Sequence, residues 1–116
     1  MRETRKRIYL AGAISSNNIL TFLSNVRIGI KIAAKLIKAG NAVFCPFVDY
    51  QFHFFEDLSI EDYYEYSLSF LEVCDEVYVL PGYENSKGTL KEIEFATAHN
   101  IPVSYLNSDY GFTVRG

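Results

Sequence analysis

Cysteine is scarce in this sequence, which limits the metal and redox chemistry that it can support. Only two cysteines, Cys45 and Cys74, occur in the 116 residues, and they do not form a CxxC pair. His53 and His99 have no partner at metal-ligand spacing, so we expect no metal site. Both cysteines lie among apolar residues, which favours buried free thiols over a disulfide, in a reducing compartment.

Long hydrophobic runs are also lacking. The apolar stretch from Ile8 to Ile14 is too short to span a membrane, and no small-residue cleavage pattern follows it. We therefore expect a cytoplasmic protein with no membrane partner and no signal peptide. No internal repeat, linker or low-complexity segment divides the chain, so residues 1–116 are expected to form one domain.

Positive charge is not in excess. The chain has 11 Lys and Arg against 14 Asp and Glu, which gives a net charge of -3. A broad nucleic-acid surface is normally basic, so we expect no nucleic-acid partner. The one basic run, Arg2, Arg5, Lys6 and Arg7, is interpreted as a solvated N-terminal tail.

Aromatic residues, in contrast, are abundant. They make up 16% of the chain, and hydrophobic residues make up 49%, which predicts a folded chain with a real core. The segment from Phe47 to Phe70 holds more aromatic side chains than so small a chain can easily bury, so we expect a homo-oligomer, a dimer or higher. One or two of these rings are also candidates for stacking on a flat ligand. The rings considered are Phe47, Tyr50, Phe52, Phe54, Phe55, Tyr63, Tyr64 and Tyr66.

Strand and helix patterns alternate along the chain. Apolar runs predict strands at 8–11, 42–45, 77–80 and 101–106, and the helices between them are expected to end near Lys38, Cys74 and Asn100. This order predicts an α/β fold. We expect a small doubly wound parallel sheet, Rossmann-like or flavodoxin-like, of four or five strands with helices on both faces.

Single residues mark helix ends and contacts. Gly40 suits the position just after a helix, where the backbone turns left-handed. The run from Ser59 to Asp62 resembles a capping box at the start of the second helix. Gly29 costs stability inside the first helix and indicates a close packing contact.

The carboxyl ends of the predicted strands define where a ligand would bind. In doubly wound sheets the binding crevice lies beyond these ends. The first three strands end at Gly12, Pro46 and Pro81, so three loops are expected to converge there.

The stretch from Asn85 to Glu92 follows the third strand and leads into a helical pattern. A strand, a small-residue loop and a helix in this order direct backbone N–H groups and a positive helix end at one pocket. Ser86, Gly88 and Thr89 can form an anion cradle there, or only a turn and an N-cap. Glu92 can be a nucleophile towards a sugar carbon, or a solvated helix carboxylate.

These residues resemble a known superfamily. The segment from Ile8 to Gly12 resembles the first strand of the nucleoside 2-deoxyribosyltransferase superfamily, and 74–89 with Glu92 matches it more closely. The spacing Ser86-x-Gly88-x-x-x-Glu92 is similar to that of the 2'-deoxynucleoside 5'-monophosphate N-glycosidases. The resemblance implies that Glu92 attacks C1' of the sugar and that Ser86 helps to bind a 5'-phosphate.

The resemblance also implies the substrate and the rest of the site. The expected ligand is a small-molecule nucleoside or nucleotide, no cofactor is needed, and members of the superfamily associate into oligomers. The residues expected to bind substrate lie in the first strand and in the converging loops. They are Tyr9, Gly12, Ser15, Ser16, Pro46, Gly82, Asn85, Ser86, Gly88 and Thr89.

One residue departs from the superfamily pattern. Ser67 occupies the place of an aspartate that helps to manage the proton on the leaving base. A serine hydroxyl cannot supply an acid of useful pKa. Asp49, Asp62, Glu65 and Glu84 are the alternatives that the sequence offers.

Two hypotheses of different classes follow. The first is an N-glycosidase (a hydrolase) or deoxyribosyltransferase-like enzyme that cleaves a (deoxy)nucleoside 5'-monophosphate through Glu92, with Ser67 in the place of the usual aspartate. The second is a weakly active or inactive module that binds a nucleotide as a sensor or sequestering protein. Glu92 favours the enzyme, and Ser67 favours the binding module.

Overall fold

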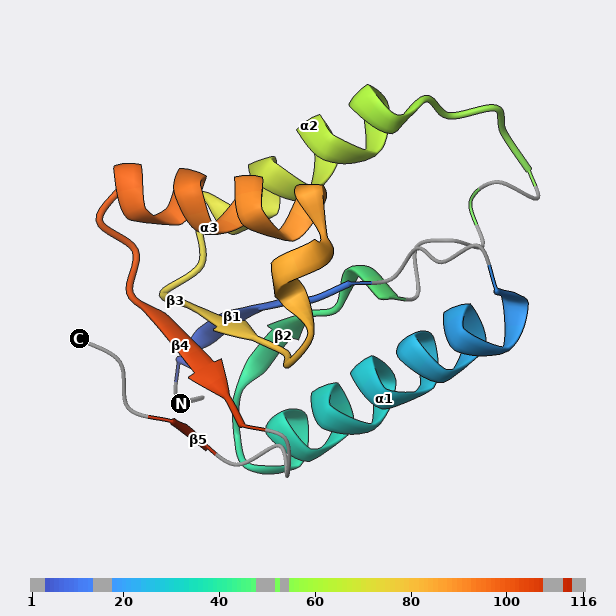
Figure 1. Cartoon of the computed structure of the whole chain (residues 1–116). Coiled ribbons are helices and arrows are strands. Elements are labelled where there is room, and N and C mark those ends of the chain that lie inside the picture. The colour runs from blue at the N-terminus through green and yellow to red at the C-terminus, as the bar shows by residue number, and fades with distance from the viewer. Residues whose placement is uncertain (1–3, 14–17, 48–51, 53–54, 108–111, 114–116) are drawn as a thin grey trace.

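The computed structural model describes residues 4–13, 18–47, 52, 55–107 and 112–113, without the side chains of 112–113. Its centre is a sheet in the order β2-β1-β3-β4-β5. The strands β1 (Arg7–Ala11), β2 (Ala42–Phe44), β3 (Glu76–Val79) and β4 (Val103–Leu106) run parallel (Figure 1). The short β5 (Phe112–Thr113) runs antiparallel to β4, a direction that the sequence pattern had not indicated.

Helices cover both faces of this sheet. Helix α1 (Ile19–Lys38) lies on one face, and α2 (Ile60–Leu71) and α3 (Lys87–Ala98) lie side by side on the other (Figure 1). The predicted doubly wound α/β fold is therefore confirmed, with each predicted parallel strand present.

Alternation along the strands divides the core into two layers. In β1, Ile8 and Leu10 pack in the layer under α1, whereas Tyr9 and Ala11 pack in the layer under α2 and α3. Side chains of a strand point alternately to opposite faces, so this division follows directly from the strand period of two residues. As a consequence, the side chain of Tyr9 faces α3.

The strand order places the reversal of the sheet between β1 and β3. From β1 the chain passes through α1 to β2 on one side, and α2 then carries it to β3 on the other side of β1. This reversal is the topological switch point, where open α/β sheets bind ligands beyond the carboxyl ends. Ala11 pairs with Val79 at that end, and α3 follows shortly after β3.

Gly29 provides the close approach that its sequence position had predicted. A Cβ atom on Gly29 would lie 2.5 Å from the Phe47 ring, and Phe47 is fully buried between α1 and the sheet. The ring also limits Gly12, where a Cβ would lie 3.0 Å from both Phe47 and Leu80. Phe47 is thus a core residue that requires two glycines around it.

The predicted helix signals are present. Gly40 has a φ of 104°, and its N–H donates to the carbonyl of Ile37 as expected after a helix end. Ser59 and Asp62 form the capping box of α2. That helix ends at Leu71 rather than near Cys74, because the chain tightens into a turn in which the Cys74 N–H donates to the Leu71 carbonyl.

Two absences can be stated for the described residues. None of the helices that the structure describes is long and apolar enough to cross a membrane. Cys45 and Cys74 are free thiols, as predicted, but they are half-buried rather than buried.

Substitution of Gly29 by alanine is expected to destabilise the protein by about 1–3 kcal/mol, because the new methyl group collides with the Phe47 ring. In an open helix the same change would stabilise by about 1 kcal/mol. Chemical denaturation measures the difference. Gly88→Ala is the matched control, since a Cβ on Gly88 would meet nothing within 4 Å. Equal stabilisation of both variants would contradict the predicted collision.

Candidate functional site

A buried carboxylate faces the sheet near the switch point. Glu92 lies in the second turn of α3 and is only 9% exposed. Its Oε2 accepts a hydrogen bond from the hydroxyl of Tyr9, which is fully buried in β1. The Tyr9 ring stacks on Phe44 of β2 at 5.3 Å between centroids, so its hydroxyl is held in one direction. Glu92 is therefore oriented by the sheet rather than by solvent.

Burial controls the protonation of this carboxylate. Desolvation raises the pKa of Glu92 from 4.5 to about 7, although the hydrogen bond from Tyr9 acts in the opposite direction. A carboxylate with a pKa near 7 is ionised in a substantial fraction of molecules at neutral pH. Such a shift is typical of functional carboxylates, and it disagrees with the alternative interpretation of Glu92 as a solvated surface residue.

The first turn of α3 forms the second part of the site. Ser86 is the N-cap of α3, its Oγ accepts a hydrogen bond from the Thr89 N–H at 3.2 Å, and it also pairs with Thr89 Oγ1 at 2.9 Å. The predicted N-cap role is thus present. The N–H groups of Lys87 and Gly88 have no partner within the helix, as is general for a first turn, and they remain suited to an anion.

The chain reaches this helix through a tight turn after β3. Gly82 has a φ of 86° and precedes the short 3-10 helix η2 (Tyr83–Asn85). A φ of this sign favours glycine, so the turn depends on Gly82. Asn85 is exposed, and no heavy atom lies within 4 Å of a Cβ built on Gly88. The backbone there is open to close approach by a ligand.

Tyr64 is a residue whose position the sequence did not reveal. Its hydroxyl donates a hydrogen bond to the Gly88 carbonyl at 3.1 Å, so it links α2 to the first turn of α3. Burial, together with the negative charges of Glu92 and Glu94, raises the pKa of Tyr64 to about 12. The sequence held one sign of this position. Tyr64 precedes Ser67 by three residues, and this spacing places the two side chains on one side of α2.

Ser67 is buried, with 7% exposure, on the side of α2 that also buries Leu71. Among the alternative carboxylates, Asp62 is committed to the capping box, and Glu65 and Glu84 are exposed. Asp49 lies outside the described residues. Among the residues that the structure describes, none of these alternatives is a buried acid, as Glu92 is.

The remaining predicted residues lie around the same end of the sheet. Gly12 directly follows β1 and is buried, and Pro46 follows β2 closely and is half-buried. Ser15 and Ser16 fall outside the described residues. Within the described ranges, no cluster of His, Cys, Asp and Glu could hold a metal ion.

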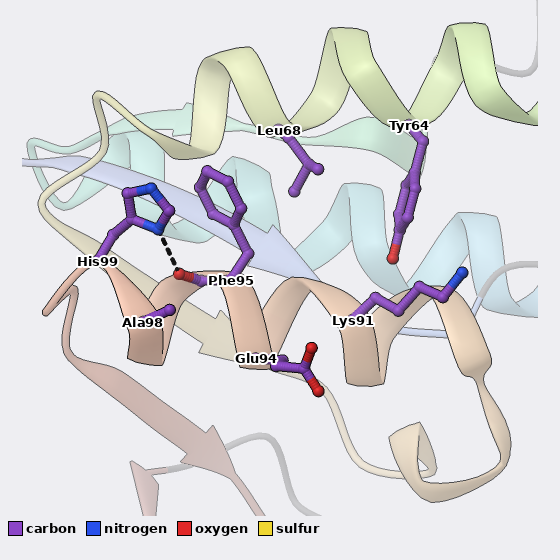
Figure 2. A pocket seen from close by; sticks show the side chains of 7 residues that line it. All are labelled: Tyr64, Leu68, Lys91, Glu94, Phe95, Ala98 and His99. Carbon is purple, nitrogen blue, oxygen red and sulfur yellow. Dashed lines mark hydrogen bonds between the residues drawn. The ribbon is translucent and has the colours of Figure 1, made fainter.

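A groove on the outer surface between α2 and α3 is separate from Glu92. It has a volume of about 340 Å3, and Figure 2 shows side chains from both helices around it. We call it the α2–α3 groove. Its lining residues are Tyr64, Leu68, Lys91, Glu94, Phe95, Ala98 and His99. Glu92 is not among them, because its side chain faces the sheet instead.

Residues 6–105 match the family described as "Domain of unknown function (DUF4406)", and the chain belongs to that family. No curated protein matches the sequence. The family therefore defines a class of domain without assigning an activity.

Two solved structures show the fold in more detail. A 2-deoxyribosyltransferase from Bacillus psychrosaccharolyticus superimposes with a TM-score of 0.59 at 19% identity, over 86% of this chain and 71% of that chain. A conserved protein from Enterococcus faecalis superimposes with a TM-score of 0.62 at 20% identity, over 91% of this chain and 65% of that chain. The predicted resemblance to the nucleoside 2-deoxyribosyltransferase superfamily is thus confirmed as a shared fold.

Replacing the buried carboxylate should change how stability depends on pH. Glu92 has a raised pKa in the folded state, so the folded protein loses stability as pH rises from about 4.5 through about 7. The loss corresponds to about 3 kcal/mol above this range. Glu92→Gln is therefore expected to raise the thermal stability above pH 7 and to leave it nearly unchanged at pH 4.

Glu94→Gln is the matched control, because Glu94 is an exposed carboxylate on the same helix. It should give no pH-dependent gain. A gain from Glu92→Gln that is equal at both pH values would show that the carboxylate does not titrate as its burial requires.

Proposed function

We propose that this chain is a nucleotide N-glycosidase, a hydrolase that cleaves a (deoxy)nucleoside 5'-monophosphate with Glu92 as the nucleophile. The observation that carries the proposal is the pairing of a buried Glu92 with the Tyr9 hydroxyl beside the switch point of the sheet. The fold shared with a 2-deoxyribosyltransferase supports the same class of chemistry.

The chemistry needs a carboxylate that is ionised, desolvated and fixed. One oxygen of Glu92 forms a bond to C1' while the bond from C1' to the base nitrogen breaks, and the bonding electrons remain on the base, which takes up a proton. Water then attacks C1', and the Glu92 carboxylate is released. Tyr9 holds Oε2, so Oε1 is the oxygen available for attack. In a transferase, a second base would replace water in the second step.

The first turn of α3 supports a phosphorylated substrate. Its N–H groups and the positive end of the helix dipole favour an anion, and Gly88 leaves room for it. Ser86 already accepts a hydrogen bond as the N-cap, and its hydroxyl proton can be donated to a phosphate oxygen when Thr89 Oγ1 is the donor in their mutual hydrogen bond. The phosphate would then lie one turn of helix away from Glu92.

The rival function is binding without cleavage. Ser67 supports this binding function. It stands where the superfamily usually has an aspartate, so this position offers no carboxylic acid to protonate the leaving base. A module of this kind would use the first turn of α3 in the same way and would hold a nucleotide as a sensor or sequestering protein.

Glu92→Gln is expected to lower the rate of base release by roughly 1,000-fold or more while nucleotide binding is retained. The assay incubates the protein with a panel of nucleosides and their 5'-monophosphates and measures free base, with calorimetry for affinity. Glu94→Gln should remain active. A fully active Glu92→Gln protein, or equal losses in both variants, would remove Glu92 from the mechanism. Binding without base release by the wild type would favour the module.

Ser67→Asp is expected to create or raise base-releasing activity. If α2 follows the superfamily, residue 67 faces Glu92, and a second carboxylate there raises the pKa of at least one of the pair and so provides a group that can protonate the leaving base. Ser69→Asp is the control, because Ser69 is exposed on the same helix. If the wild type is fast and Ser67→Asp slows it, another residue is the acid.

A further inference from the structure

Charge is sorted between the two faces of the molecule. Helix α1 carries Arg27, Lys31, Lys35 and Lys38 and no acidic residue, although the whole chain has a net charge of -3. On the opposite face, α2 and its C-cap carry Glu61, Glu65 and Glu72, all exposed (Figure 1). The two faces therefore attract each other but cannot meet within one chain, because the sheet separates them.

Helix α1 also leaves an apolar row in solvent. Ile19, Leu23, Ile30 and Ile37 are exposed by 65%, 49%, 41% and 49%. At about 100° per residue they lie within roughly 40° of one another along the whole helix. The basic side chains form a second row about 90° further around the same helix. An exposed apolar row of this kind, repeated along a helix, marks an interaction surface.

The α2–α3 groove offers the matching features. Its lining includes the apolar side chains of Leu68, Phe95 and Ala98 (Figure 2). On α2, the row of Glu61, Glu65 and Glu72 lies about 60° beyond the groove-lining Tyr64 and Leu68. The groove thus has apolar lining residues, with Lys91, Glu94 and His99 on its α3 side, and an acidic row runs along its α2 side.

We propose that α1 of one copy docks in the α2–α3 groove of a second copy. The apolar row of α1 fills the groove, and its basic row lies along the acidic row of α2. This is the mode in which an amphipathic helix binds an apolar groove.

The order of the rows fixes the direction of docking. Each helix can be viewed from its N-terminus, going around it in the direction in which the residues advance. On both α1 and α2, the charged row then comes after the apolar row. Two helices with this arrangement match apolar to apolar and charge to charge only when they run antiparallel. Lys38 then lies near Glu61, Lys35 near Glu65 and Arg27 near Glu72, because both charged rows span 11 residues, or about 16 Å.

Charge favours this contact over the symmetric ones. Two α1 helices, or two α2 helices, packed antiparallel would bring like charges together, and packed parallel they would leave the charged rows without partners. Because α1 and the groove lie on opposite faces of one chain (Figure 1), the contact is head-to-tail, and each docked pair leaves one α1 and one groove free. Such a contact continues to larger assemblies until a ring closes.

A charge-swap experiment tests the contact with the full chain. The first variant carries Arg27→Glu and Lys35→Glu, and the second carries Glu65→Lys and Glu72→Lys. Light scattering should show that the wild type associates above its monomer mass of 13.2 kDa with rising concentration, and less so in high salt. Each variant alone should associate at least roughly tenfold more weakly, since like charges then oppose each other.

The equimolar mixture of the two variants is the decisive sample. Each variant's α1 then meets a groove of opposite charge, so association should return. Glu84→Lys, an exposed change of charge outside α1, α2 and α3, should leave association unchanged. Circular dichroism confirms that each variant is folded.

Three results would overturn the proposal. The first is a wild type that stays monomeric at high micromolar concentration, and the second is a pair of variants that associate as the wild type does. The third is a wild type that remains monomeric but binds vesicles of anionic lipid through Arg27 and Lys35, which would make α1 a membrane-surface helix instead.

Discussion

The hydrogen bond between Tyr9 and Glu92 is the interaction on which the candidate site depends. It joins the first strand to the third helix across the core layer under α2 and α3 and holds a carboxylate out of water. An isolated carboxylate in such surroundings would be strongly disfavoured. The Tyr9 hydroxyl reduces that cost but does not remove it, because the pKa of Glu92 remains raised to about 7. The site therefore retains a destabilising charge, which is a common property of catalytic positions.

The strand order explains why this pair can form. Tyr9 points towards α3 only because β1 alternates its side chains between the two faces, and α3 begins just beyond the strand that neighbours β1. The fully buried Phe47 ring packs on the other face of the sheet, against α1. The core layer under α1, which contains Phe47, therefore lies on one face of the sheet. The layer that holds Tyr9 and Glu92 lies on the other.

Much of this arrangement could be predicted from local sequence patterns. The parallel strands, the Gly29 contact, the Gly40 helix end and the capping box at Ser59 each depend on a short segment, and each is confirmed. The likeness to a deoxyribosyltransferase fold was also visible in the motif around Glu92. These features have strong local causes, so no knowledge of distant contacts was needed.

The remaining features depend on contacts between distant segments. The hydrogen bond from Tyr64 to the Gly88 carbonyl and the bond from Tyr9 to Glu92 join residues that no sequence period connects. The two-residue β5 is too short to have a pattern. The proposed match between the basic row of α1 and the acidic row of α2 emerges only when both faces are placed in space. The residue that would protonate a leaving base also could not be predicted from the sequence, because the candidates come from distant segments.

The most direct measurement is a carbon-13 NMR titration of the Glu92 side-chain carboxyl, assigned by comparison with Glu92→Gln. The burial and the hydrogen bond predict a pKa of about 7 in the wild type, and a higher value in Tyr9→Phe, because the hydroxyl that favours the charged form is then lost. A wild-type pKa near the ordinary value of 4.5, unaffected by Tyr9→Phe, would contradict the account of Glu92 as a buried, positioned nucleophile.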